Sequence, residues 1–214
     1  MITKEKEETV AIQLDNVVLP GRLMVPENAT GIVIFAHGSG SSRLSPRNNY
    51  VADVLQKNGL ATLLFDLLTE EEDRVYENRF DIDLLTARLI AVTKWILKNP
   101  TTRDMPVGYF GASTGAASAL MAATHFGTQV KAVVSRGGRP DLSMNDLNKV
   151  KAATLLIVGG LDYPVILLNQ QAFNILICKK ELEIVDGASH LFEETGKLET
   201  AARLATGWFM KYLK

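Results

Sequence analysis

The hydrophobic positions of the chain gather into short, dense runs that recur along its length. Six of these runs are rich in β-branched residues and span 31–38, 61–68, 106–113, 130–138, 153–160 and 181–187. Their interiors are apolar without alternation, which is typical of parallel strands that are covered on both faces. Two earlier stretches, 9–16 and 17–25, predict a hairpin of two antiparallel strands.

Segments with a helical spacing of apolar residues separate these runs, at 47–57, 80–98, 113–124, 165–177 and 193–212. Regular alternation of strands and helices predicts right-handed crossovers and a doubly wound, mostly parallel α/β sheet. We expect one domain over residues 1–214, with no cap domain. The acidic segment 69–79 is expected to be a solvated loop. Because no insertion of cap size follows the strand at 130–138, the pocket should be shallow and open, which favours short acyl groups.

A nucleophile is predicted after the strand at 106–113, because loops at the carboxyl ends of strands carry the chemistry in such sheets. The strand runs into Gly111-Ala112-Ser113-Thr114-Gly115 and then into a helix. This is the G-x-S-x-G pattern in its strand–turn–helix context, where glycine relieves crowding two residues from the nucleophile. The alternative is a serine that only caps the helix. We interpret Ser113 as the nucleophile.

An acid and a base follow Ser113 in the order that this pattern requires. Asp162 comes directly after the strand at 153–160, and His190 follows the strand at 181–187. An imidazole can take the serine proton near neutral pH, and a carboxylate orients the ring. Asp186 and Asp141 are rival acids, each near the end of a strand. We predict the triad Ser113, His190 and Asp162.

The loop after the strand at 31–38 supplies the second half of the predicted oxyanion hole. Donors in this arrangement are the backbone N–H after the nucleophile, here Thr114, and one from this loop, for which we choose Ser39. His37 is expected to brace the loop. His125 lies near the end of the helix after Ser113, where it meets the helix dipole favourably.

Four arginines lie on loops at the same predicted edge of the sheet: Arg43, Arg47, Arg136 and Arg139. Guanidinium groups there could bind a carboxylate or phosphate of an anionic ester. Of these, Arg136, Arg139 and Arg43 are our substrate-binding candidates, with Arg136 first because Gly137 and Gly138 bring the backbone close. The alternative is that the arginines pair with Asp53, Asp66, Asp141 or the acidic run 70–73.

With these motifs in hand, the chain resembles the dienelactone-hydrolase-like branch of the α/β-hydrolase superfamily. The resemblance runs from about residue 17 to residue 214 and is carried by HGSGSS, GASTG, GGLDYPV and GASHLF, in that order. It looks especially like small bacterial hydrolases that are sometimes fused to a phosphoribosyltransferase-like domain, which we do not expect here. The resemblance implies a cofactor-free hydrolase. Dienelactone hydrolase itself has a cysteine nucleophile, so Ser113 favours a serine esterase.

The predicted function is cleavage of small carboxylic esters through an acyl-enzyme on Ser113. The same triad would also suit a thioesterase, an acyltransferase or a peptidase, because fold and triad leave the acyl group and its acceptor open. A non-catalytic ligand-binding protein on this fold is a further alternative. Turnover of a simple ester distinguishes it from an enzyme.

Charge and composition exclude several classes of binding partner. The net charge is -1 and charged residues make up 22% of the chain, which favours neither nucleic acid nor a membrane surface as a partner. No metal-ligand spacing occurs, and Cys178 is the single cysteine, so no internal disulfide can form. The stretch MITKEKEETV has no apolar core of a leader, and no apolar run reaches membrane length. We expect a cytoplasmic protein and leave homo-oligomer formation open.

Overall fold

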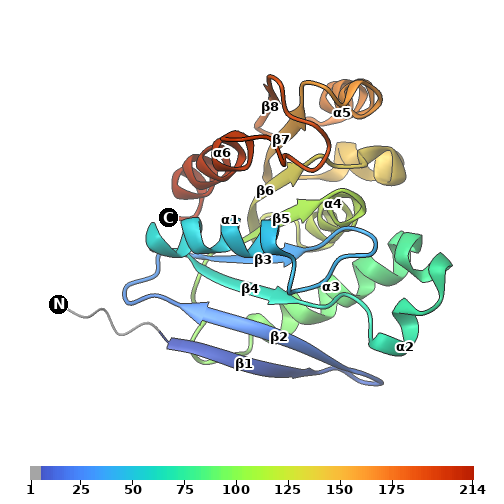
Figure 1. The fold of residues 1–214 in the computed structure, drawn as a ribbon. Helices are drawn as coiled ribbons and strands as arrows, with labels where there is room; N and C mark the ends of the chain where they lie inside the picture. The colour runs from blue at the N-terminus through green and yellow to red at the C-terminus, as the bar shows by residue number, and fades with distance from the viewer. Residues whose placement is uncertain (1–5) are drawn as a thin grey trace.

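One eight-stranded sheet organises the chain in this computed structural model, which describes residues 6–214 (Figure 1). Its strand order is β1-β2-β4-β3-β5-β6-β7-β8. The strands are β1 (Lys6–Gln13), β2 (Val18–Val25), β3 (Ile32–Ala36), β4 (Ala61–Phe65), β5 (Val107–Ala112), β6 (Val130–Arg136), β7 (Ala153–Gly159) and β8 (Lys180–Val185). The first five residues of MITKEKEETV, which we searched for a leader, lie outside the described residues.

The predicted direction of the strands is confirmed. β3 to β8 are parallel, whereas β1 pairs antiparallel with β2 and β2 pairs antiparallel with β4. The first strand of the hairpin lies earlier than the predicted 9–16. The chain turns where the Leu14 N–H donates to the Val17 carbonyl oxygen (2.9 Å), so β1 ends at Gln13.

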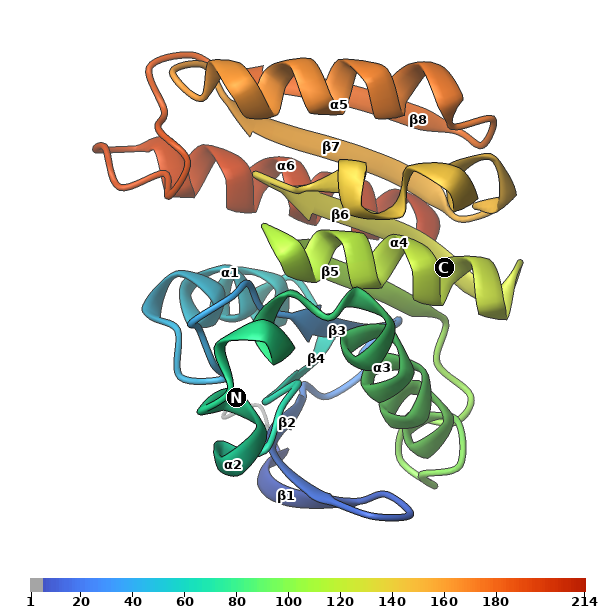
Figure 2. The ribbon, with the colours of Figure 1, turned by 90° about the vertical axis from the view of Figure 1, so that its right-hand side faces the viewer.

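The long helices cover both faces of the sheet, as doubly wound topology requires. They are α1 (Pro46–Lys57), α3 (Ile82–Ile96), α4 (Thr114–Phe126), α5 (Tyr163–Ile175) and α6 (Lys197–Tyr212). Figure 2 shows α3, α4 and α5 in front of the sheet, with α1 and α6 behind it. Within residues 6–214 no inserted segment forms a cap domain over the edge of the sheet where the parallel strands end.

Side chains of the central strands alternate between two cores. In β3, Ile32 and Ile34 pack into the core beneath α3 and α4, while Val33 and Phe35 pack into the core beneath α1 and α6. All of β3 is buried. The lack of polar alternation in the sequence therefore follows from burial on both faces.

The segment 69–79 is exposed to solvent, as predicted, but it is not a loop. It forms α2 (Glu70–Asp73) and the 3₁₀ turn η1 (Tyr76–Phe80). The Thr69 hydroxyl accepts the Glu72 N–H, and the Glu72 carboxylate accepts the Thr69 N–H, which makes a capping box. The Glu72 carboxylate also pairs with Arg88 of α3. These bonds to α3 and within the box order a segment that has no buried apolar residue of its own.

Two other features went unpredicted. The 3₁₀ segment η2 (Pro140–Lys149) follows β6 and packs against α4 and α5. Cys178, the single cysteine, is half-buried, and its thiol lies 3.7 Å from the Thr154 hydroxyl. Among residues 6–214, no helix has the length and apolar content needed to cross a membrane.

Candidate active site

Ser113 occupies the sharp turn between β5 and α4. Its backbone angles are φ 51° and ψ -120°, in a region that a residue other than glycine rarely adopts. Two bonds hold this turn: the Ser113 N–H donates to the Arg136 carbonyl oxygen (3.2 Å), and the Arg139 N–H donates to the Ser113 carbonyl oxygen (3.1 Å). Backbone strain of this kind persists where the surroundings over-determine it, which is typical of functional sites.

The flanking glycines are explained by how closely the turn packs. A Cβ atom at Gly115 would lie 2.2 Å from the Ala36 carbonyl oxygen, and one at Gly111 would lie 2.5 Å from the Ala116 Cα. Both obstacles are backbone atoms, which cannot rotate away. The start of α4 therefore lies directly against the end of β3, and the G-x-S-x-G spacing records that contact.

His190 and Asp162 meet across the loops that follow β8 and β7. The His190 Nδ1 lies 2.6 Å from the Asp162 Oδ2, and the Leu161 N–H ties the two loops together by donating to the Ala188 carbonyl oxygen (2.9 Å). The Asp162 side chain is 13% exposed and that of His190 is 38% exposed. A carboxylate can only accept, so Nδ1 carries a proton, and in the neutral ring Nε2 is the nitrogen with the free lone pair.

The rival acids lie elsewhere. Asp141 accepts two bonds from the Arg139 guanidinium, at 2.9 Å from Nε and 2.8 Å from Nη2. Asp186 is exposed on the turn after β8. Of the three carboxylates that the sequence offered, Asp162 is the one in contact with His190 in the described part of the chain.

The predicted oxyanion loop lies against the start of α4. The Ser39 N–H donates to the Thr114 hydroxyl (2.9 Å), a side-chain bond that the sequence did not indicate. Thr114 itself is 3% exposed and is the first residue of α4, whose N-terminal N–H groups favour negative charge. A substrate oxyanion at this position would share or replace the Thr114 hydroxyl as the acceptor for Ser39.

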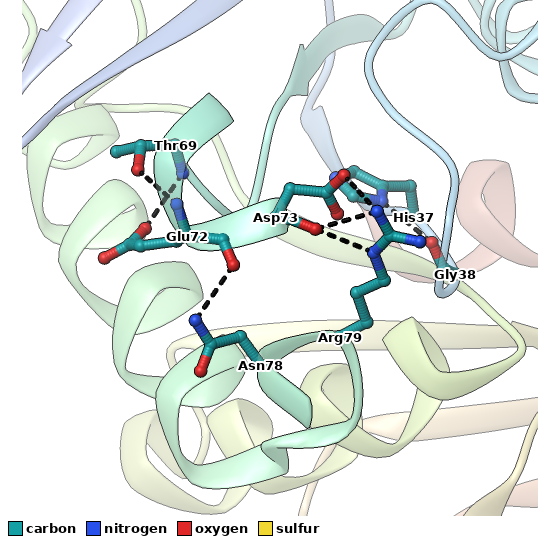
Figure 3. A network of polar contacts seen from close by, with 7 residues as sticks. All are labelled: His37, Gly38, Thr69, Glu72, Asp73, Asn78 and Arg79. Carbon is teal, nitrogen blue, oxygen red and sulfur yellow. Dashed lines mark hydrogen bonds and ion pairs between the residues drawn. The ribbon is translucent and has the colours of Figure 1, made fainter. Parts of the chain in front are cut away.

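His37 joins the oxyanion loop to the chain after β4. Its Nε2 accepts the Leu67 N–H (3.0 Å), and its Nδ1 donates to the Gly38 carbonyl oxygen (3.0 Å). Figure 3 shows Asp73 and Arg79 beside this turn, where the Arg79 guanidinium donates to the Asp73 carboxylate (2.9 Å). These are the contacts of a bracing residue, as predicted for His37. His125, by contrast, is exposed near the end of α4.

Lowering the pH should lower the free energy of unfolding, because the buried His37 resists protonation in the folded protein. Burial above all lowers the pKa of His37 below its ordinary 6.5, despite the nearby charges of Asp66 and Asp73. At pH values between that lowered pKa and 6.5, the unfolded chain is protonated at His37 while the folded protein is not. The stability that comes from keeping His37 neutral is therefore complete above pH 6.5 and is lost as the pH falls.

The check is urea unfolding of the wild type and His37→Gln from about pH 7 to about pH 5. The wild type should lose up to about 1.4 kcal/mol more per pH unit than the variant, which has no group to titrate there. Equal slopes of the unfolding free energy against pH would contradict the prediction, whatever the absolute stability of the variant.

Three of the four loop arginines have carboxylate partners. Arg43 pairs with Asp66, Arg139 with Asp141, and Arg47 with Glu193 (Nη1 to Oε1, 2.9 Å). Arg43 and Arg139 thus follow the pairing alternative, with partners that the sequence analysis had named. The partner of Arg47 had not been named, because it lies 146 residues away. Arg136 forms no ion pair with any carboxylate of residues 6–214.

A small cavity of about 190 Å³ brings the candidates together. Ser113, His190, Ser39, Arg136 and Arg47 all line it, whereas Arg43 and Arg139 do not. Asn48, which the sequence analysis missed, also lines it and is 3% exposed. In residues 6–214, no three His, Cys, Asp or Glu side chains are grouped so as to hold a metal ion.

The sequence of the chain matches a known protein family. Residues 19–213 match the model of the dienelactone hydrolase family. The chain belongs to this family. A crystal structure of the dienelactone hydrolase from Anabaena variabilis superposes with a TM-score of 0.96 at 55% identity, covering 99% of this chain and 100% of that one. The predicted α/β-hydrolase fold and the resemblance to the family are both confirmed.

Two further sequence relatives and one further structure are also similar to this member of the dienelactone hydrolase family. Two Mycobacterium tuberculosis proteins that bear a phosphoribosyl transferase name are 56% identical over 208 residues, which is 97% of this chain and 47% of theirs. The chain thus spans about half the length of the curated relatives it matches. Est1E from Butyrivibrio proteoclasticus shares the fold (TM-score 0.78) at 15% identity, over 95% of this chain and 98% of that one. Family and fold together support a hydrolase.

Proposed function

We propose that the protein is a serine hydrolase that cleaves small carboxylic esters through an acyl-enzyme, with Ser113, His190 and Asp162 as the triad. The observation that carries the proposal is one cavity lined by both a serine in strained backbone and a histidine bonded to a carboxylate. Nucleophile, base and orienting acid are the parts that acyl transfer to serine requires.

The steps follow from the tautomer of His190. Its Nδ1–H is held by Asp162, so Nε2 takes the proton as the Ser113 hydroxyl attacks the ester carbonyl. The backbone N–H groups of Ser39 and Thr114 bind the oxyanion, aided by the N-terminus of α4. His190 then protonates the departing alcohol. In the second half, His190 deprotonates a water molecule that cleaves the acyl–Ser113 bond, which releases the acid and regenerates the serine.

The size of the cavity favours short acyl groups. A volume of about 190 Å³ lies below the roughly 300–1,000 Å³ typical of pockets that enclose larger ligands. An acyl chain longer than this cavity would leave its outer methylenes in water, where they gain nothing from burial.

A series of p-nitrophenyl esters from acetyl to dodecanoyl tests this proposal. We expect turnover of the short esters, with no further rise of kcat/KM for longer chains. A deep apolar pocket would instead add about 0.8 kcal/mol, or about fourfold, for each buried methylene. If the correctly folded protein turns over none of these esters, the esterase proposal is refuted. If kcat/KM continues to rise with chain length, the short-chain preference is refuted.

A further inference from the structure

Arg136 lies on the strand next to the one that leads into the proposed nucleophile. It ends β6, where its Cα pairs with that of Ala112, the residue before Ser113. Its side chain lines the same cavity as Ser113 and His190. A group bound by this guanidinium would therefore share the cavity with an ester carbonyl that Ser113 attacks.

The guanidinium is buried without a counter-charge. Arg136 is 6% exposed, and its Nε and Nη1 are enclosed with no hydrogen-bond partner in residues 6–214. Burial, with a smaller effect from the positive charge of Arg47, lowers the pKa of Arg136 to about 10, so the group stays charged at neutral pH. An unpaired charge removed from water is costly, and proteins retain one mainly where it has a function.

The loop after β8 holds this cation in place. The ring of Phe192 lies 5.8 Å from the Arg136 Cζ, within the range of a cation–π contact. Phe192 is 1% exposed and has φ 59°, which is strained for a bulky residue. The next residue, Glu193, pairs with Arg47 (2.9 Å). The guanidinium of Arg136 thus packs against Phe192, while Glu193, the acidic residue that follows Phe192 in the chain, pairs with Arg47.

A second polar group in the cavity is also unsatisfied. Asn48 Oδ1 is enclosed and has no hydrogen-bond partner among the described residues. Buried polar atoms are nearly always paired in folded proteins, so two unsatisfied groups on one cavity point to a polar ligand. The two groups ask for different partners: the Asn48 oxygen accepts and so suits a hydroxyl of the ligand, whereas the unpaired positive charge of Arg136 suits an anionic oxygen.

We propose that the cavity accepts an anionic oxygen group of the substrate, a carboxylate or phosphate, against Arg136. This inference rests on the proposed function, in which Ser113 attacks an ester in the same cavity, and it adds the chemical class of the substrate. The guanidinium fork binds such a group with charge-assisted hydrogen bonds. Arg136 determines specificity here and takes no part in the proton transfers of Ser113 and His190.

Paired esters test the specificity. The probes are p-nitrophenyl hydrogen glutarate, which carries a carboxylate, and p-nitrophenyl valerate, its neutral counterpart of similar size. Arg136→Gln should lower kcat/KM for the glutarate by about 10- to 150-fold, which corresponds to about 1.4–3 kcal/mol, and should lower it much less for the valerate. Arg103→Gln is the control, because Arg103 is exposed and pairs with Asp104 away from the cavity.

A second measurement needs no turnover. Sodium glutarate or inorganic phosphate should raise the Tm of the wild type above its value in sodium chloride of equal ionic strength, because an anion bound to the native state stabilises it. Arg136→Gln and Arg136→Met should lose this shift. Without anions, both variants should unfold at the same or a higher temperature than the wild type, since each removes a buried, unpaired charge.

The outcomes separate the two proposals. An unchanged glutarate-to-valerate ratio in Arg136→Gln, or a wild-type Tm that does not respond to the anions, would overturn the anion site. Stabilisation by anions that depends on Arg136, together with no turnover of any ester, would leave the anion site standing and refute the esterase. If Arg136→Gln does not fold, Arg136→Met and the wild-type Tm shift decide the question.

Discussion

The Ser113→Ala variant is expected to lose at least about 10⁴-fold in kcat on a short-chain ester. The hydroxyl oxygen is the atom that would form the acyl bond, and in the variant the elbow presents a methyl group in its place. The wild type should also take up one equivalent of a fluorophosphonate probe, and the variant should take up none. Intact-mass measurement after labelling and steady-state kinetics provide the two readouts.

Ser42→Ala is the matched control for this experiment. Ser42 lies on the same loop as Ser39 but does not line the cavity, so its loss should leave both labelling and kcat close to wild type. A label that persists in Ser113→Ala would show that another residue is the nucleophile. Ser41 and Ser45, which also line the cavity, would then be the next residues to replace.

The second large effect is expected from Asp162→Asn, which should lower kcat by roughly 10⁴-fold while the protein stays folded. An asparagine amide can donate to His190 Nδ1, so the ring would turn to the tautomer whose Nε2 is protonated. That tautomer cannot accept the proton of Ser113. The measurement is kcat on the same ester, with circular dichroism to establish that the fold is retained.

Asp141→Asn and Asp186→Asn serve as matched controls for the acid. Asp141 bonds to Arg139, and Asp186 is exposed, so neither change should alter kcat by more than a few-fold. If either control loses activity to the degree expected for Asp162→Asn, while Asp162→Asn keeps it, the acid has been assigned to the wrong carboxylate.

Patterns with a strong local cause were predictable from the sequence. The inner parallel strands were visible because burial on both faces leaves almost wholly apolar runs, as in Ile32–Ala36. The edge strand β8 is only partly buried and carries Lys180, Glu181 and Glu183, so this cause does not apply to it. The elbow was visible because the contact between α4 and β3 permits only glycine at Gly115. The placement of Asp162 and His190 after neighbouring strands followed from topology alone, and the structure brings these two side chains within 2.6 Å.

Features that depend on distant partners were not predictable. The helix at Glu70–Asp73 has no apolar face; its capping box, Thr69 with Glu72, is a local pattern that the sequence analysis missed, whereas the pairing of Glu72 with Arg88 of α3 depends on a distant partner. The sequence analysis could not decide which arginines would be paired, because Arg47 finds its carboxylate at Glu193 across the fold. The bond from Ser39 to the Thr114 hydroxyl likewise appears only when two loops meet.

The short loop at 190–193 contributes to the proposed base, to the position of Arg136 and to the pairing of Arg47. It carries His190, places the Phe192 ring beside Arg136, and supplies Glu193 to Arg47. Replacing Phe192 would therefore disturb proton transfer and charge preference together, and its effect would not add simply to that of Arg136→Gln. Single substitutions in this loop are thus poor routes to a changed substrate preference in laboratory evolution, and compensating pairs that include Arg136 or Arg47 are the better starting library.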